Sequence, residues 1–274
     1  MEGPSLIILK EELKPFVGRK VLEVSGNTKQ PKELLQGRKL ASIRTWGKVL
    51  FMEFTGAKKT APILTRTHFM MFGSYRIDDP KENRVPRIEL RFANGTLYFY
   101  ACAFKFVEKE SLKELDPKVD VLSPKWDEAH VLDLMKEKRD TYLCDLFLDQ
   151  KLFAGSGNIV KNEVLFNLRC HPLTKLSELK RADWPLAVHE VRLYCENFYR
   201  WKKNYELRRH WQVYRKHRCP ICGEKIKREK LGRFERSTFY CVKHQTHPHG
   251  HRVTHHDVLP PSAPKRAPEK RLDH

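Results

Sequence analysis

The chain has 274 residues and a formal net charge of +19 at pH 7, from 53 Lys and Arg against 34 Asp and Glu. Apolar and aromatic residues make up 40 %, enough for two domains that each have a hydrophobic core. No apolar run approaches the roughly eighteen residues of a membrane span, and the start lacks the charged-then-apolar order of a signal peptide. We therefore expect an intracellular, cytoplasmic protein without a membrane partner, whose positive field favours binding to nucleic acid.

The first hundred residues have the pattern of an antiparallel β-structure. Gly3-Pro4 interrupts the chain before Leu6, Leu9 and Leu13, whose spacing predicts a short helix. Short β-prone runs follow at residues 21–25, 39–45, 49–54, 62–67, 75–77, 88–92 and 96–100. These runs favour a sandwich or barrel, and Asn94-Gly95 predicts a type I′ turn between the last two.

Helical patterns dominate after residues 116–126, where two prolines and no clear period predict the interdomain linker. Asp127 is expected to cap the first helix, and residues 142–150 form a second helical run. Residues 154–158, AGSGN, then precede an apolar-periodic helix over 159–166. Its free backbone N–H groups predict an anion site beside Asn158.

The last predicted helix begins near Pro185 and has one apolar stripe. Spacings of four, three, four and three residues separate Ala187, Val191, Tyr194, Phe198 and Trp201. The periodicity indicates that these aromatic side chains are core residues and do not bind a cofactor.

Two short motifs near the end predict a metal site. Cys219 and Cys222 form a C-x2-C knuckle, and Cys241 and His244 repeat the spacing as C-x2-H. Four such ligands can hold one structural Zn²⁺ in a tetrahedral site. The residues between the knuckles predict a hairpin that bends at Gly232 and that depends on the metal for its stability.

The hairpin is rich in basic residues, which favour a polyanion at its tip. They are Lys225, Lys227, Arg228, Lys230, Arg233 and Arg236. The other cysteines, Cys102, Cys144, Cys170 and Cys195, show no pairing pattern and fit a reducing compartment. Residues 247–274 are rich in His, Pro, Lys and Arg, and we expect a disordered basic tail.

The order of these parts resembles the formamidopyrimidine-DNA glycosylase and endonuclease VIII family of base-excision repair enzymes. The resemblance rests on Glu2-Gly3-Pro4, on Asp149-Gln150 before the GSGN segment, on Asn162-Glu163, and on the terminal run from Arg236 to Gln245. It implies an α+β fold with four parts. These are an N-terminal β-sandwich over 1–120, a helix-two-turn-helix domain over 127–217, a β-hairpin zinc finger over 218–246, and the tail.

The resemblance also implies which residues act on DNA. The family attacks the sugar C1′ of a damaged nucleotide with the amine of its N-terminal residue and holds the sugar as a Schiff base while phosphates are eliminated. The Met1 α-amine would take this role, Glu2 would move protons, and Lys48 matches a family lysine in a β-turn. Without the resemblance, Lys48 would be interpreted as an ordinary lysine in a turn.

The implied DNA contacts fall into two groups. Met70, Met71 and Phe72 match a loop that fills the gap left by the flipped nucleotide, and Met71 is the best candidate wedge. By composition alone these three residues would be core. Asn158 and Arg236 match residues that hold phosphates. The implied partner is double-stranded DNA with damaged bases or abasic sites, bound by a monomer.

Two departures from the family pattern bear on activity. The family begins with Met-Pro-Glu-Gly-Pro-Glu, whereas this chain has no such proline and has Ser5 in place of the second Glu. If Met1 is retained, its primary amine takes the position of the proline amine. His244 stands where the family usually has a fourth cysteine, and imidazole is also a zinc ligand.

Three hypotheses follow. The first is a bifunctional DNA glycosylase and AP lyase acting on oxidised bases, leaning to pyrimidines because the segment between Tyr199 and Arg218 is short. The second is a lesion-binding protein whose catalysis was impaired by loss of the proline. The third is a general zinc-ribbon nucleic-acid binder, against which the Glu-Gly-Pro start and Lys48 argue.

Overall fold

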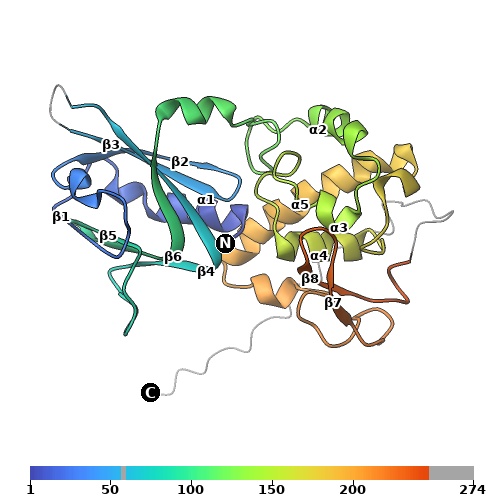
Figure 1. The fold of residues 1–274 in the computed structure, drawn as a ribbon. Helices are drawn as coiled ribbons and strands as arrows, with labels where there is room; N and C mark the ends of the chain where they lie inside the picture. Colours follow the sequence, from blue (N-terminus) through green and yellow to red (C-terminus); the bar gives the residue numbers. More distant parts are fainter. Residues whose placement is uncertain (57–59, 247–274) are drawn as a thin grey trace, which may run out of the picture.

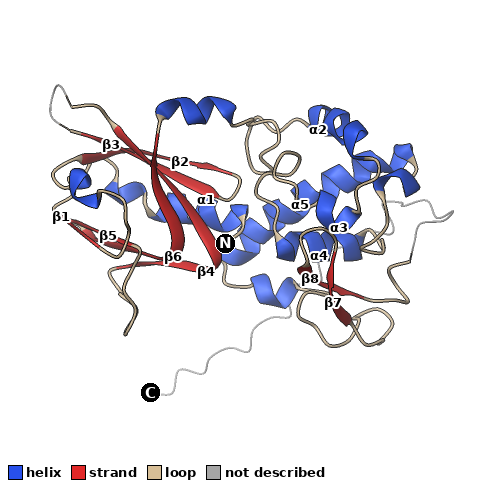
Figure 2. Cartoon of the chain, viewed as in Figure 1, coloured by secondary structure: helices blue, strands red, loops and turns tan. Residues whose placement is uncertain are grey.

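The computed structural model describes residues 1–56 and 60–246; the tail predicted over 247–274 lies outside the described residues. A β-rich half and a helical half lie side by side, with the N-terminus where they meet (Figure 1). The strands of the β-rich half are accompanied by α1 and by short 3-10 helices, whereas the other half is helical apart from the small hairpin (Figure 2). The antiparallel sheet, the helices and a cysteine-rich hairpin confirm the predicted fold class.

The β-rich half is a six-stranded antiparallel sheet in the order β1-β5-β6-β4-β3-β2. Its strands are β1 (Glu23–Ser25), β2 (Lys39–Trp46), β3 (Val49–Thr55), β4 (Ile63–Ile77), β5 (Ile88–Phe92) and β6 (Gly95–Val107). Side chains from β2 and β3 enter the same cluster as side chains from β5 and β6. The sheet therefore folds over one core, which α1 (Gly3–Glu12) completes with Leu6 and Leu9.

The structure corrects three local predictions in this half. The runs at 62–67 and 75–77 are a single strand, β4, and β6 continues past Tyr100 to Val107. Phe92 pairs with Gly95, so the turn residues are Ala93 and Asn94. Neither has the positive φ that a type I′ turn requires, and only Gly95, at 142°, has one.

The helical half contains α2 (Glu128–Met135), α3 (Leu143–Leu146), α4 (Asn158–Asn167) and α5 (Trp184–Lys203). Asp127 caps α2 as predicted, because its side chain accepts a hydrogen bond from His130 N–H. The run at 142–150 is shorter than predicted: α3 has four residues and hydrogen-bonded turns follow. The apolar stripe of α5 enters the helical core, which confirms that Tyr194 and Phe198 are core residues.

Among the contacts that join the halves close to the N-terminus, two involve α1 and the predicted linker. Helices α1 and α5 pack together, and Glu11 of α1 accepts hydrogen bonds from Tyr199 at 2.5 Å and Lys203 at 2.8 Å. The predicted linker also contributes, because Asp120 is buried and its Oδ2 accepts a 2.9 Å bond from Gly47 N–H. The domain limits themselves stay predictions.

The predicted ribbon is a hairpin of β7 (Lys227–Leu231) and β8 (Arg236–Tyr240) that turns at Gly232, where φ is 72°. It shares a small core with α4, because Phe166 packs with Val213, Ile226 and Phe239. Figure 1 shows the hairpin beside α3 and α4.

Candidate active site in a basic cleft

A cleft of about 1900 Å³ opens where the N-terminus, α4, the end of α5 and the hairpin converge. Among residues 1–56 and 60–246, ten Lys or Arg residues line it against two Glu residues, Glu2 and Glu235. The basic residues are Lys48, Lys202, Arg208, Arg215, Lys216, Arg218, Lys225, Arg228, Lys230 and Arg236. Low-dielectric walls lined by one sign of charge concentrate the field, so the cleft favours a polyanion.

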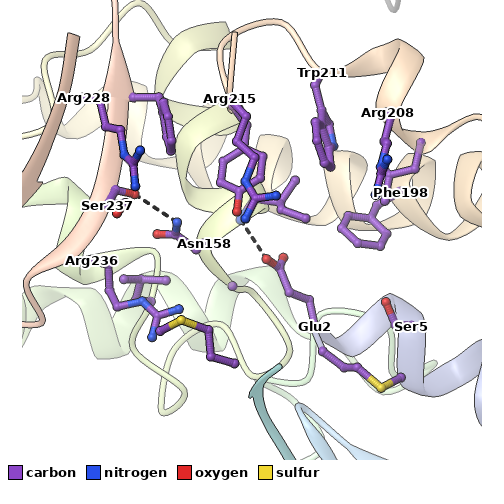
Figure 3. Close-up of a pocket in the computed structure, with 18 of the residues that line it drawn as sticks. Glu2, Ser5, Asn158, Phe198, Arg208, Trp211, Arg215, Arg228, Arg236 and Ser237 are labelled. Carbon is purple, nitrogen blue, oxygen red and sulfur yellow. Dashed lines mark hydrogen bonds between the residues drawn. The ribbon is translucent and has the colours of Figure 1, made fainter. Parts of the chain in front are cut away.

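The Glu2 carboxylate lies at the N-terminus of α4 (Figure 3). Its Oε1 accepts a 2.7 Å hydrogen bond from Ile159 N–H, and its Oε2 lies 3.4 Å from Val160 N. A Cβ at Gly157 would collide with the Glu2 carboxyl group, so a side chain at this position would displace Glu2 from the helix end. The predicted anion site at this helix end is thus filled by the chain's own carboxylate.

Burial raises the pKa of Glu2, although the two backbone hydrogen bonds and the nearby Lys48 and N-terminal ammonium oppose the shift. A carboxyl group with a raised pKa can hold and release a proton closer to neutral pH than an ordinary glutamate. The position of Glu2 therefore suits proton transfer.

The Met1 α-amine lines the same cleft. Its pKa is lowered, chiefly by burial and then by the positive charges of Lys48, Lys202 and Arg236, while Glu2 acts in the opposite direction. A lower pKa leaves more of the amine unprotonated at neutral pH, and the unprotonated amine is the nucleophilic form.

Lys48 lies in the turn between β2 and β3 and crosses to the helical half. Its Nζ donates a 2.8 Å hydrogen bond to Ser156 O in the loop before α4. Burial lowers the pKa of Lys48, with Arg236 acting in the same direction and Glu2 against it. Lys48 is therefore held by a defined partner in the cleft and is not an ordinary solvated turn lysine.

A close backbone approach brings these three groups together. Gly3 N–H donates a 2.9 Å hydrogen bond to Gly155 O, and a Cβ on Gly3 would lie 2.7 Å from Gly155 Cα. Gly155 has a φ of 105°, a backbone conformation that residues other than glycine rarely adopt. The predicted GSGN turn thus docks the N-terminus onto the start of α4.

The apolar segment Met70 to Gly73 bulges out of β4. Four residues lie between Phe69, which pairs with Cys102, and Ser74, which pairs with Tyr100, so they oppose the single residue Ala101. Met70, Met71 and Phe72 are consequently 53 %, 67 % and 80 % exposed, and all three line the cleft. The interpretation of this segment as core is wrong, because the bulge removes it from the sheet.

Asn158 and Arg236 also face the cleft, from α4 and β8 (Figure 3). The Asn158 Nδ2 donates a 2.9 Å hydrogen bond to Ser237 O, next to Arg236. Four of the six basic hairpin residues predicted to meet a polyanion line the cleft; Lys227 and Arg233 do not.

The sulfur atoms of Cys219, Cys222 and Cys241 lie within 4.8 Å of one another and could hold one metal ion. His244 is not part of this group. Its ring packs on Phe166 at a centroid distance of 5.0 Å, and its buried Nε2 has no hydrogen-bond partner among the described residues. Three thiols grouped in this way, with an unpartnered imidazole nitrogen on the residue three positions after Cys241 in the chain, are a donor set that suits a zinc ion.

The sequence interpretation missed the cleft wall between α5 and the hairpin. Arg208, Trp211, Tyr214 and Arg215 line it, and Glu163 holds its backbone by accepting hydrogen bonds from the N–H groups of residues 212, 213 and 214. The basic and aromatic residues that alternate before Cys219 are the sequence pattern that could have predicted this wall.

Fold and site together define a protein of two halves with a basic cleft between them. Residues 2–107 match the family model of the formamidopyrimidine-DNA glycosylase N-terminal domain. The chain is 31 % identical over 216 residues to endonuclease 8-like 3 of Mus musculus, covering 76 % of this chain and 35 % of that protein. It is 29 % identical over 239 residues to formamidopyrimidine-DNA glycosylase of Neisseria meningitidis, and the match covers 76 % of this chain and 83 % of that protein.

Among solved structures, the fold is similar to that of Lactococcus lactis formamidopyrimidine-DNA glycosylase bound to DNA containing an AP site. The TM-score is 0.74 at 23 % identity, covering 90 % of this chain and all of the other. The chain belongs to the formamidopyrimidine-DNA glycosylase and endonuclease VIII family. It spans about a third of the endonuclease 8-like 3 proteins that it matches. Within the described residues, no helix is long and apolar enough to cross a membrane.

Proposed function

We propose that the protein is a bifunctional DNA glycosylase and AP lyase that removes oxidised bases from double-stranded DNA in base excision repair. One observation carries the proposal: the Met1 amine, the Glu2 carboxyl and the Lys48 ammonium group line one basic cleft and shift one another's pKa values. Such a set supplies a nucleophile, a proton carrier and a fixed positive charge.

In the proposed reaction the unprotonated Met1 amine attacks C1′ of the damaged nucleotide, and the base departs with the electrons of the glycosidic bond. The amine nitrogen then loses a proton and expels O4′ from C1′, O4′ takes up a proton, and the opened sugar is joined to Met1 through an imine. An imine from a primary amine must be protonated before it can accept electrons during phosphate elimination. Glu2, whose pKa is raised by burial, is suited to supply this proton.

The DNA would lie along the basic cleft. Met71, with Met70 and Phe72, would enter the stack in place of the flipped nucleotide, because apolar side chains replace stacking without requiring hydrogen bonds. Asn158 and Arg236 would hold phosphates beside the lesion, and Lys48 would stabilise negative charge near the sugar. A metal ion on Cys219, Cys222 and Cys241, with His244 as the proposed fourth ligand, would be a structural zinc that stiffens the base of the hairpin.

We infer a preference for oxidised pyrimidines from the wall between α5 and the hairpin. The segment between Tyr199 and Arg218 is short, and Glu163 of α4 holds the backbone of residues 212–214 within it. This arrangement supports a compact lesion pocket over one closed by a long capping loop.

Borohydride trapping tests the proposal on duplexes that contain an abasic site or an oxidised pyrimidine. Reduction of the Schiff base should join protein and DNA covalently, and peptide mapping should find the link at Met1. Acetylation of the N-terminus should abolish the link, while Glu2→Gln should retain DNA binding but lose base excision by about a hundredfold or more. The intact mass of the purified protein establishes whether Met1 carries the free amine.

The same experiment separates the alternatives. A crosslink at Lys48 would assign the nucleophile to that lysine. Tight binding to lesion DNA without any crosslink would identify an impaired lesion-binding protein, which the absence of the family's proline motivates. Equal binding to damaged and undamaged DNA would instead favour a general nucleic-acid binder.

A further inference from the structure

Lys161 is a cation in the interior, on the face of α4 that packs against β8. It has no solvent exposure, although lysine is among the residues least often buried. Asn158 and Asn162, three residues before and one after it, also hydrogen-bond to β8. Lys161 therefore lies in a polar interface between α4 and the strand that carries Arg236.

A hydrogen-bond relay connects Lys161 to the backbone of Arg236. The Lys161 Nζ donates a 2.7 Å bond to Thr238 Oγ1, and the Thr238 hydroxyl donates a 2.9 Å bond to Arg236 O. The Nζ also lies 3.5 Å from Ser237 O. An ammonium group at the head of a relay polarises the next bond and strengthens it.

The need for hydrogen bonds alone does not explain a buried ammonium here. Without Lys161, Ser237 O would keep its bond from Asn158, and the Thr238 hydroxyl would keep its bond to Arg236 O. An apolar side chain of similar length would therefore leave neither group unsatisfied. What would disappear is the positive charge behind the β8 strand.

We propose that Lys161 is a positioning residue that fixes Arg236 for phosphate binding through Thr238 and adds positive potential to that site. The inference rests on the proposed DNA binding. It requires that the lysine be charged when DNA binds, and the surroundings of Lys161 make that charge depend on pH near the physiological range.

The groups that act on Lys161 come from three elements. Cys144 and Asp145 face it from α3, Arg236 from β8, and Glu2 from the N-terminus. The pKa of Lys161 is lowered to about 8, chiefly by burial and also by Arg236, while Cys144, Asp145 and Glu2 act in the opposite direction. Burial raises the pKa of Cys144 to about 12, so that thiol does not titrate between pH 7 and 9.

The sign of the stability effect follows from this shift. An unfolded lysine has a pKa of about 10.4, so the unfolded chain binds more protons than the folded chain between pH 8 and 10, and this group makes stability rise with pH in that window. At neutral pH the buried charge is therefore a cost to folding. Loss of the charge should not destabilise the protein, whereas loss of a purely structural contact should.

The test uses the full chain and a duplex with a tetrahydrofuran abasic analogue. Lys161→Met should weaken binding on the order of threefold to tenfold at pH 7, without lowering the melting temperature or changing the salt slope, because Lys161 touches no phosphate. Lys161→Arg keeps the charge above pH 8 and should retain binding at pH 9, where the wild-type protein weakens. Thr238→Val should reproduce the loss by interrupting the relay.

Hydrogen exchange of the DNA-free protein tests the positioning separately. Exchange at the β8 amides should accelerate in Lys161→Met while exchange in α5 stays unchanged. Unchanged β8 exchange, or equal DNA affinity of the wild-type protein and Lys161→Met at pH 7, would overturn the inference. A wild-type protein that does not bind the duplex, with β8 exchange still dependent on Lys161, would contradict the proposed function and leave the relay as a feature of the hairpin alone.

Discussion

At the scale of single residues, burial changes the chemistry of three ordinary groups. Desolvation raises the pKa of Glu2 and lowers that of the Met1 amine and of Lys48. Glu2 opposes the pKa shifts of the two cations and they oppose that of Glu2, whereas Lys48 adds to the shift of the Met1 amine. The sequence predicted the three residues only through a resemblance. The tertiary contacts supply the physical reason why an amine, a carboxyl group and a lysine could act together.

Met71 offers a residue-scale prediction. It is 67 % exposed in a bulge of β4, so Met71→Ala should change stability by less than about 0.5 kcal/mol. Excision of a paired oxidised base should slow by roughly tenfold or more, because the base must leave a filled stack. Cleavage at a preformed abasic site should be largely retained, and single-turnover kinetics on both duplexes measure the difference.

A matched control is Val85→Ala, which removes an apolar side chain that is 68 % exposed and does not line the cleft. It should leave both reactions unchanged. Equal losses on both substrates for Met71→Ala would show that Met71 supports the fold and does not act as a wedge.

At the scale of elements, α4 organises the site. Its N-terminal N–H groups hold Glu2, its polar face holds β8 through Asn158, Lys161 and Asn162, and Phe166 enters the core of the hairpin. At the far end of the hairpin, the carboxylate of Asp145 in α3 accepts a 2.8 Å bond from Arg233 N–H. The hairpin is therefore anchored by the helices as well as by its cysteines.

Metal removal tests this division of roles. Elemental analysis should find one zinc per chain, and chelation should increase hydrogen exchange at the knuckles around Cys219 and Cys241 most strongly. DNA affinity should fall by roughly tenfold, because the base of the hairpin loosens, while α5 keeps its protection. Cys222→Ser should reproduce the effect, whereas Cys102→Ser, in the sheet and away from the metal, should retain zinc. Absence of zinc, or equal affinity after chelation, would contradict the structural role.

At the scale of the whole molecule, the net charge of +19 can attract a polyanion strongly only where the fold brings basic residues together. The cleft collects basic residues from the β2–β3 turn, α5, the segment before Cys219 and the hairpin. These elements are distant in sequence, so composition indicated a polyanion partner but not the surface that would bind it.

The salt dependence of DNA binding distinguishes this local charge from net charge. Arg236→Ala should weaken binding by roughly tenfold and reduce the slope of log K against log salt by about one, because one phosphate contact and its released counterion are lost. Lys125→Ala removes the same charge from an exposed site outside the cleft lining and should leave the slope unchanged. Identical slopes for both variants would remove Arg236 from the interface.

Local sequence patterns determined several caps, turns and buried faces of this protein. The Asp127 cap, the apolar stripe of α5 and the hairpin bend at Gly232 depend on residues within a few positions of one another, so periodicity and turn chemistry were sufficient. The paired cysteine motifs likewise brought three thiols together as predicted.

Only the tertiary structure decided the features that depend on register and on distant contacts. Whether Met70 to Phe72 are core or exposed depends on the pairing of β4 with β6, where one residue opposes four. Whether the end of α4 is an open anion site depends on Glu2, 157 residues away from Ile159. A sequence pattern reports the local preference of the backbone, whereas burial, pKa and the partners of Lys161 arise from packing between segments that the pattern cannot bring together.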